Sequence, residues 1–499
     1  MFLHKFLFLW QLAAATVLLL SAATVQGSAA SSSSSNNAAP SWLNVDKETI
    51  QKFMDLARQR HKQAIQRAQE NYNLDTAPKY PPDNDLLKNQ LQLQPHLIHS
   101  SGMLPDFQEE LEKRLFVTTP QPLFTPEECQ DCIQKAEAHF AANSGGKWST
   151  LPSGQYDVAG FWIRDVPAVY EWFLQMLQRR LFPLLAKTFP EFTNEDIQNL
   201  VVDNAYLFKY TPETGRRTDV HTDSGCLSFT ISLNPKREYQ GGGTWFEGLE
   251  SNDNNDSSTN SNCVIEMDVG QCTVRPGGVR HCGYAVTEGT RYIIGGFCMQ
   301  KQKVEYVRML LNMGHDMDTV QERQTALEVA IALNPNFDGP YTNLADLLQA
   351  EGQSDRAKQV LEHCLEHVNP QCGEAAYTLG NIEFDKQNYA AARKCMETCL
   401  QADECDVDAM ILMAQIAAAN RSREDEIKWY ERVIDTPGAS DKAFASAYCN
   451  LGVLHEGQDE ELDYYRKALA VAPETFAPRY SLASTYASRK EWTKAAQEF

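Results

Sequence analysis

Short runs in which apolar and polar residues alternate fill the chain between about residues 200 and 300. The clearest run is 226–234 (CLSFTISLN), in which every second residue is large and apolar while serine and threonine lie between. This alternation predicts a strand with one buried face. Further strand-like runs, separated by glycine and proline, are 201–210, 244–246, 262–268, 271–276 and 291–299. We therefore expect an antiparallel barrel or jelly roll in this part of the chain.

The pattern changes after about Val304, where alanine and leucine recur at helical spacing. The recurrence has a period of about 34 residues, which is typical of tetratricopeptide units built from two antiparallel helices. The units run from Tyr341 to Cys364, Ala376 to Cys399, Met410 to Val433 and Tyr448 to Pro473, and a fifth begins at Leu482. These apolar positions are core by default, so none is assigned an individual function.

The amino-terminal region has two parts. A basic start is followed by an apolar run at 6–25 and by small residues up to Gly27, which predicts a cleaved signal peptide or an uncleaved type II membrane anchor. A disordered Ser/Asn/Ala tract and a charged amphipathic helix, Asp46 to Asn71, then follow, and we expect this helix to pack on the β-rich core. Either form of leader directs the chain into the secretory pathway, with the endoplasmic reticulum lumen as the expected location.

Composition adds three constraints. The formal net charge of −21 argues against nucleic-acid binding and allows attraction of a basic peptide. Thirteen cysteines suit an oxidising compartment, although their pairing cannot be read from the sequence. Cys129 and Cys132 follow a helix start at Thr125 and are expected to be structural rather than redox-active. Two glycosylation sequons begin at Asn255 and Asn420, and the first lies in a polar insertion that we expect to be a surface loop.

The candidate chemistry lies in His221-Thr222-Asp223 together with His281 and Arg291. Residues i and i+2 of an extended segment point to the same side, so His221 and Asp223 can bind one ion together. A third ligand would come from a distant strand, and His281 lies 58 positions after Asp223. Two imidazoles and one carboxylate form the ligand set of non-haem Fe(II) oxygenases, and Arg291 would offer a forked cation to a carboxylate co-substrate. The alternative is a surface loop with a hydrogen-bonded histidine at a strand end.

The stretch from Tyr206 to Phe297 resembles the catalytic domain of prolyl 4-hydroxylases and procollagen lysyl hydroxylases. The resemblance runs through HTDSGCLSFTISLN, YQGGGTWF and RPGGVRHCGYAVTEGTRYIIGGF, and it extends back to about Phe116. It is closer to the lysyl hydroxylases, because collagen prolyl 4-hydroxylases usually carry lysine where Arg291 stands. The collagen prolyl hydroxylases also contain tetratricopeptide units, but there these units precede the catalytic domain, whereas here they follow it.

The resemblance implies a double-stranded β-helix (jelly-roll) core and a dioxygenase reaction. Fe(II) would be bound by His221, Asp223 and His281, and 2-oxoglutarate would chelate the iron and pair its distal carboxylate with Arg291. O2 would take the remaining position, and ascorbate is an expected further requirement. Ser232 or Thr230 could assist Arg291, and Tyr210 could line the pocket, although a tyrosine on a barrel strand is more often core. Cys282 is expected to pack rather than to bind metal.

Together these features predict a multidomain chain with four segments. They are a signal peptide or anchor at 1–27, a linker with the charged helix at 28–104, a dioxygenase at 105–302, and all-α tetratricopeptide-like repeats at 303–499. The predicted function is Fe(II)- and 2-oxoglutarate-dependent hydroxylation of a peptidyl residue, lysyl rather than prolyl, in a secretory-pathway protein. The repeats would bind the substrate or a partner protein. The alternative is a lumenal tetratricopeptide scaffold whose oxygenase domain is catalytically silent.

Overall fold

A computed structural model describes most of the chain beyond residue 40. The described residues are 40–97, 114–118, 122–149, 158–190, 197–212, 218, 220–223, 225–247, 249, 264–436, 439–458 and 460–498. The predicted leader at 1–27, the greater part of the Ser/Asn/Ala tract and the sequon at Asn255 lie outside them. Contacts divide the chain into the units Met1–Asn44 and Val45–Phe499, and the second unit contains the sheets and the helical repeats. No helix in the described ranges has both the length and the apolar character required to cross a membrane.

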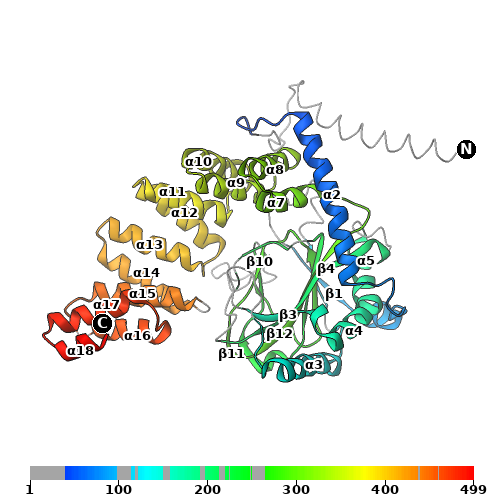
Figure 1. The fold of residues 1–499 in the computed structure, drawn as a ribbon, viewed down its shortest axis with the longest axis horizontal. Coiled ribbons are helices and arrows are strands. Elements are labelled where there is room, and N and C mark those ends of the chain that lie inside the picture. The colour runs from blue at the N-terminus through cyan, green and yellow to red at the C-terminus, as the bar shows by residue number, and fades with distance from the viewer. Residues whose placement is uncertain are drawn as a thin grey trace, which may run out of the picture. The chain divides into compact units, whose positions relative to one another are not determined.

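The described strands between residues 93 and 300 pair into antiparallel sheets (Figure 1). A seven-stranded sheet has the order β1-β2-β9-β5-β12-β4-β3, a three-stranded sheet the order β10-β7-β8, and β11 pairs with β6. The strands are β1 (Leu93–Leu97), β2 (Arg114–Thr118), β3 (Ala159–Trp162), β4 (Leu200–Tyr210), β5 (Leu227–Ser232), β6 (Tyr239–Gly241), β7 (Thr244–Phe246), β8 (Val264–Ile265), β9 (Cys272–Pro276), β10 (His281–Gly283), β11 (Val286–Gly289) and β12 (Arg291–Gln300). Most of the predicted strands are thus present with small shifts at their ends, but of the run at 262–268 only Val264 and Ile265 form a strand among the described residues.

The strand β5 shows both the strength and the limit of the alternation argument. Its apolar residues Leu227, Phe229 and Ile231 join the main core, which also contains residues of α3 (Pro126–Ser144), α4 (Pro167–Met176) and α5 (Phe182–Thr188). The alternation predicted one buried face, but the serine and threonine positions between these residues are buried as well. The reason is that this second face lies inside the β-region, where Thr230 accepts a hydrogen bond from the buried Arg275.

The charged helix α2 (Lys47–Asn71) begins after Asp46, whose side chain accepts a hydrogen bond from the backbone of Thr49. Its apolar stripe, which includes Ala64 and Ala68, packs against Val201 of β4 and Met299 of β12. The predicted packing of this helix on the β-rich core is therefore confirmed. The sheet itself begins earlier than expected, because β1 lies in the stretch that the sequence assigned to a linker and pairs with β2.

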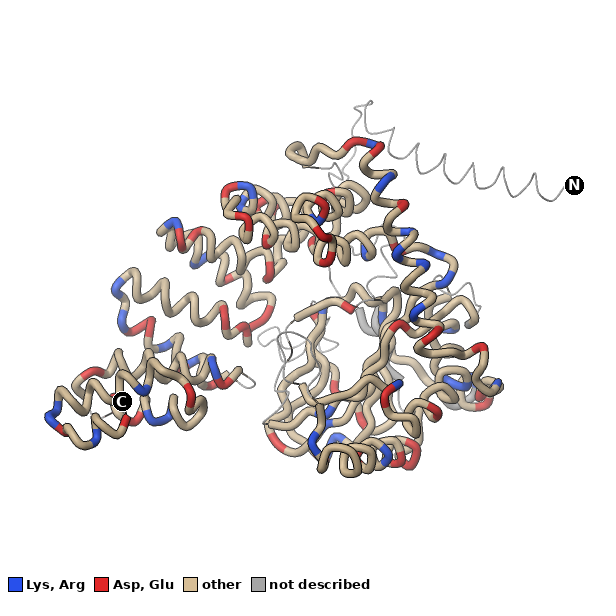
Figure 2. Tube along the Cα trace, in the orientation of Figure 1, with Lys and Arg blue, Asp and Glu red and all other residues tan. Residues whose placement is uncertain are grey.

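Twelve helices, α7 to α18, follow one another from Tyr306 to Glu498 as antiparallel pairs (Figure 1). They are α7 (Tyr306–Asp316), α8 (Val320–Leu333), α9 (Gly339–Ala350), α10 (Ser354–His363), α11 (Gly373–Asp385), α12 (Tyr389–Ala402), α13 (Val407–Ala419), α14 (Arg423–Asp435), α15 (Asp441–Leu454), α16 (Glu460–Val471), α17 (Phe476–Ser488) and α18 (Trp492–Glu498). The pair α7–α8 precedes the first unit that the sequence pattern had marked. Figure 2 shows acidic and basic residues interspersed along these helices.

The expected division at residues 302 and 303 is not a break in the packing. One buried apolar cluster contains Phe246 and Val279 of the β-region together with Val307, Leu310 and Phe337 of the helical region. Phe53 and Ala57 of α2 belong to the same cluster. Residues of the β-region and of the first helices therefore share a core, and Val45–Phe499 form one compact unit.

Candidate metal centre

An isolated β-bridge brings His221 and His281 together. The backbone N–H of each residue donates to the carbonyl oxygen of the other at 3.0 Å. Asp223 is fixed two residues further on, where its N–H donates to the carbonyl of Gly277 at 2.8 Å. One potential ligand atom from each of His221, Asp223 and His281 then lies within 4.8 Å of the other two. The structure thus gathers the three residues that the sequence proposed as metal ligands.

The three side chains differ in exposure. Asp223 and His281 are buried, at 3% and 5% exposed, whereas the His221 side chain is 45% exposed. The Nε2 atoms of His221 and His281 lie 3.8 Å and 3.5 Å from the two oxygens of Asp223. The cluster therefore opens toward solvent on the His221 side, where a small molecule could approach.

The hydrogen bonds of His281 fix which of its nitrogens carries the proton. Its Nδ1 lies 2.9 Å from the carbonyl oxygen of Val279, and a carbonyl only accepts, so Nδ1 donates. The Nε2 atom then presents its lone pair to the cluster. Burial, followed by the positive charge of Arg275, lowers the pKa of His281 to about 3. A neutral imidazole held by a backbone carbonyl on its far nitrogen is the usual form of a histidine that binds a metal.

Asp223 is ionised despite its burial. Burial raises the pKa of this carboxyl, but electrostatic interactions with His281, with the guanidinium of Arg275 and with His221 outweigh that effect and leave the pKa below its ordinary value. A buried carboxylate needs a cation or several donors to offset its lost hydration. Here Arg275 supplies one such partner, with its Nη2 at 2.9 Å from Oδ2 of Asp223.

Arg275 on β9 is a site residue that the sequence did not single out. It is 2% exposed, its Nη2 also donates to Nε2 of His281 at 2.7 Å, and its Nη1 donates to Thr230 at 3.1 Å. Its Nε has no hydrogen-bond partner among the described residues. The guanidinium therefore contacts the same oxygen and nitrogen that a metal ion would use. The alternation of β9 gave a signal, because it places Arg275 on the same face as Thr273, but it did not indicate burial.

Arg291, the predicted co-substrate cation, is buried at the start of β12 with 1% exposure. Its Nη1 donates to the carbonyl of Gly243 at 2.7 Å, and its guanidinium carbon lies 5.7 Å from the ring centroid of Tyr210. Its Nε lacks a partner within the described part of the chain. Gly242 allows this arrangement, because a Cβ there would lie 3.1 Å from Cδ of Arg291 and its φ is +71°. A buried guanidinium with unused donors suits an anionic ligand.

The three secondary candidates occupy different places. Tyr210 lies beside Arg291, as expected for a pocket residue, and burial raises its pKa to about 12. Thr230, one of the two residues expected as a possible helper of Arg291, accepts a hydrogen bond from Arg275. Ser232 lies at the end of β5, where its Oγ is 3.4 Å from the carbonyl oxygens of Asn234 and Met267. Cys282 is fully buried, consistent with a packing role. Cys129 and Cys132 are buried free thiols.

Two buried arginines outside the cluster hold its backbone. Arg308 of α7 donates to the carbonyl oxygen of Asp223 and pairs with Glu305 at 3.1 Å. Arg280, which precedes His281, pairs with Glu247 at 3.1 Å and with Glu374 of α11 at 2.8 Å. Sequence reasoning missed both, because an arginine is seldom fully buried unless it is paired, and the pairing partners Glu374 and Asp223 lie far away in the sequence.

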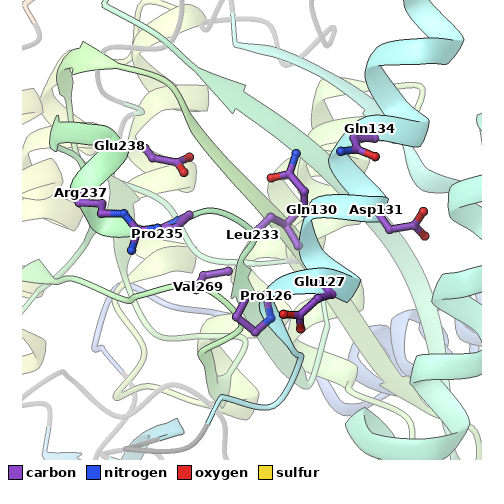
Figure 3. Close-up of a pocket in the computed structure, with 10 residues that line it drawn as sticks. All are labelled: Pro126, Glu127, Gln130, Asp131, Gln134, Leu233, Pro235, Arg237, Glu238 and Val269. Atoms are coloured by element: carbon purple, nitrogen blue, oxygen red, sulfur yellow. The ribbon is translucent and has the colours of Figure 1, made fainter.

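A separate surface hollow lies between the start of α3 and the loop that follows β5. Residues of these two segments, among them Gln130, Leu233 and Arg237, line a cavity of about 430 Å³ (Figure 3). None of the proposed metal ligands lines it. The hollow therefore does not contribute to the candidate metal centre.

Comparisons with known proteins concern the helical region. Two models of the tetratricopeptide repeat match residues 326–359 and 377–441, and no curated protein matches the chain. Among solved structures, YrrB, described as a TPR protein with an unusual peptide-binding site, is 23% identical over 35% of this chain and 88% of its own, with a TM-score of 0.30. MamA from Desulfovibrio magneticus RS-1 is 18% identical over 32% of this chain and 89% of its own, with a TM-score of 0.28.

A tetratricopeptide repeat protein from Parabacteroides merdae ATCC 43184 is also similar, at 17% identity over 39% of this chain and 76% of its own, with a TM-score of 0.31. The family matches fall on the stretch from α8 to α14. The carboxy-terminal helices of this chain accordingly form a solenoid that carries tetratricopeptide repeats.

Proposed function

We propose that this chain couples a protein- or peptide-binding tetratricopeptide solenoid to an Fe(II)- and 2-oxoglutarate-dependent dioxygenase. The dioxygenase would hydroxylate a peptidyl residue, lysyl rather than prolyl, of a secretory-pathway protein in the endoplasmic reticulum lumen. The repeats support the proposed binding of a protein or peptide, because tetratricopeptide proteins typically bind peptides or partner proteins. The proposed dioxygenase activity is supported by one observation: ligand atoms of His221, Asp223 and His281 lie within 4.8 Å of one another.

The donor set fits Fe(II). Two imidazoles and one carboxylate on one side of the ion leave positions open for other ligands. His281 is in the tautomer that offers Nε2, Asp223 is ionised, and His221 borders solvent. The seven-stranded and three-stranded antiparallel sheets support a double-stranded β-helix core, in which ligands from facing strands can meet.

Arg291 fits the distal carboxylate of 2-oxoglutarate. Its guanidinium is bonded to Gly243, while the ring of His281 stacks on Phe246 with centroids 5.8 Å apart. Residues 243 and 246 are three positions apart, and three extended residues span at most about 10 Å. The metal cluster and the cation therefore lie at the two ends of one short segment. That spacing suits a small dicarboxylate that binds the metal at one end and an arginine at the other.

Some residues of this chain would bind the co-substrate, and others would orient it. Arg291 and Tyr210 would hold the distal end of the co-substrate, and Asp223 and the two histidines would orient its 2-oxo acid end. Buried strands around the cluster would exclude water from the reacting centre. When bound, Fe(II) with 2-oxoglutarate and O2 would supply oxidative decarboxylation to succinate and hydroxylation of a C–H bond, with ascorbate as an expected further requirement.

A second candidate function is a scaffold whose β-region is catalytically silent. Two observations favour it. The comparisons concern the repeats alone, and they support the scaffold role more directly than the catalytic one. In addition, the guanidinium of Arg275 contacts the ligating atoms of Asp223 and His281, so it satisfies in part the charge that a metal would otherwise neutralise.

Succinate release separates the two candidates. The full-length protein would be incubated with Fe(II), 2-oxoglutarate, ascorbate and air, together with lysine- or proline-containing peptides. The catalytic proposal expects succinate and a peptide that gains one oxygen atom, both lost in His221→Ala and retained in His315→Ala, an exposed histidine of α7. Succinate formation that is unchanged in His221→Ala would show that the metal assignment is wrong. Peptide binding by the repeats without any succinate would establish the scaffold.

A further inference from the structure

Both segments that carry the proposed ligands are held by buried arginines whose other partners lie on or beside the helical region. One segment, 221–223, contacts Arg308 of α7, and the other, around His281, contains Arg280, which pairs with Glu374 of α11. These contacts connect the site to residues that lie 85 and 94 positions further along the chain. Arg308 and Glu374 of the helical region thus contact the two segments that carry the proposed metal ligands.

Arg308 holds the backbone carbonyl of Asp223. It is 7% exposed, and its Nε donates to Glu305, which is 5% exposed. Because Glu305 balances the charge, the guanidinium can remain buried while Nη1 donates to the carbonyl oxygen of Asp223. The N–H of Asp223 is already bonded to Gly277. The peptide groups on both sides of this ligand are therefore fixed, one by the turn that follows β9 and one by α7.

Arg280 fixes the segment that contains His281 through its ion pairs. Its side chain is 12% exposed and lies between Glu247, at 13%, and Glu374, at 38%. The N–H of Glu247 also donates to the carbonyl of Arg280 at 3.1 Å. Glu374 is the member of this group that comes from the solenoid. Removing its charge would leave a buried guanidinium with one carboxylate instead of two, directly beside His281.

The shared apolar cluster makes these polar contacts part of one packed body. Phe246, which stacks on His281, lies in the same buried cluster as Val307 and Leu310 of α7. A packed core transmits a displacement of one element to its neighbours, because it contains little free volume.

We propose that α7 and α11 are positioning elements of the candidate metal centre, with Arg308, Arg280 and Glu374 as the positioning residues. This inference rests on the proposed metal-binding function. It assigns the solenoid a role beyond binding a partner, because the geometry of the ligands depends on it. Arg308 holds a backbone carbonyl, and the pair of Arg280 and Glu374 holds the segment that leads into His281, so each acts through the backbone.

A comparison of Glu374→Gln with Glu383→Gln tests the inference in the full-length protein. Glu383 is the matched control, because it lies on the same helix, is 4% exposed and pairs with Lys358 at 2.5 Å within the solenoid. The first readout is hydrogen–deuterium exchange of the amides of His221, Asp223 and His281 in metal-free protein. The second is the affinity for Co(II), measured from its visible absorption spectrum.

We expect Glu374→Gln to speed exchange at these three amides by about tenfold and to weaken Co(II) binding by about tenfold. Glu383→Gln should change neither, because its ion-pair partner Lys358 lies within the solenoid and not on a ligand segment. The double variant Arg280→Gln/Glu374→Gln should be no worse than Arg280→Gln alone, because the two residues act as one unit. Equal exchange in Glu374→Gln and the unaltered protein would overturn the inference. If exchange rises as expected but the unaltered protein binds no Co(II), positioning stands and the proposed function fails.

Discussion

Nη2 of Arg275 donates a hydrogen bond to Nε2 of His281 over 2.7 Å. The lone pair of this nitrogen is the one that a metal ion would use, so the guanidinium and the ion compete for it. The same Nη2 lies 2.9 Å from Oδ2 of Asp223. Arg275 is therefore the residue that most directly sets how strongly the cluster can bind a cation.

Replacing Arg275 with glutamine should strengthen metal binding. The change removes a positive charge that repels a divalent ion in a poorly hydrated site, and it frees the lone pair of His281. We expect Co(II) affinity to rise about tenfold or more by equilibrium titration. If affinity instead falls, Arg275 assists metal binding, and the guanidinium and the ion do not compete for His281.

Replacing Arg291 should affect the co-substrate and leave the metal alone. Arg291→Gln should weaken 2-oxoglutarate binding about 100-fold, because a charge-assisted, two-point contact is lost, while Co(II) affinity stays unchanged. Arg291→Lys should recover part of this loss, since it restores the charge but not the fork. Calorimetric titration of 2-oxoglutarate into the Co(II)-loaded protein measures both variants. Equal affinity in the unaltered protein and in Arg291→Gln would remove Arg291 from the co-substrate site.

The helix pair α15–α16 offers a test of solenoid packing. A Cβ added at Gly452 would lie 2.5 Å from the ring of Tyr465, and an aromatic ring cannot yield as a flexible chain end does. Gly452→Ala should therefore destabilise the solenoid by about 1–3 kcal/mol, since overpacking exceeds the gain of about 1 kcal/mol in helix propensity. In Gly373→Ala the new Cβ meets its nearest neighbour at an ordinary 3.4 Å, so this control should be neutral or slightly stabilising. Urea unfolding distinguishes the two variants.

His61 should make stability depend on pH. It is 3% exposed on α2, and burial lowers its pKa below the ordinary value. The unfolded chain then binds a proton near pH 6.5 that the folded protein does not, so stability is complete above that pH and is lost as the pH falls. His61→Leu should reduce the slope of unfolding free energy between pH 6.5 and pH 5. A slope identical to that of the unaltered protein would mean that His61 can be protonated in the folded state.

Local patterns in the sequence predicted several elements correctly. Alternation predicted β4 and β5, capping residues predicted the start of α3, and helical spacing predicted the tetratricopeptide pairs. The approach of His221, Asp223 and His281 was also expected, because residues i and i+2 of an extended segment share a side. Each of these inferences depends on residues close together in the sequence or on one long-range pairing.

The remaining features depend on contacts that no local pattern contains. Arg275, Arg280 and Arg308 resemble surface arginines in the sequence, and only the assembled core shows that they are buried. The strand β1 lies in a stretch where Leu91, Leu93 and Leu97 alternate with Gln92, Gln94 and His96. Pro95 interrupts this run and argues against a paired strand, so the stretch was interpreted as a linker although it pairs with β2. The hydrogen bond between Thr230 and Arg275 was likewise not expected, because Thr230 had been considered only as one of two residues that could assist Arg291.

The central claim is that His221, Asp223 and His281 form an Fe(II) site that takes 2-oxoglutarate. Its most direct test is anaerobic titration of the full-length protein with Fe(II) and 2-oxoglutarate, followed by visible absorption spectroscopy. We predict a charge-transfer band that requires both components, saturates at one Fe(II) per chain and is absent in Asp223→Asn. The absence of such a band in the unaltered protein, or its persistence in Asp223→Asn, would contradict the claim.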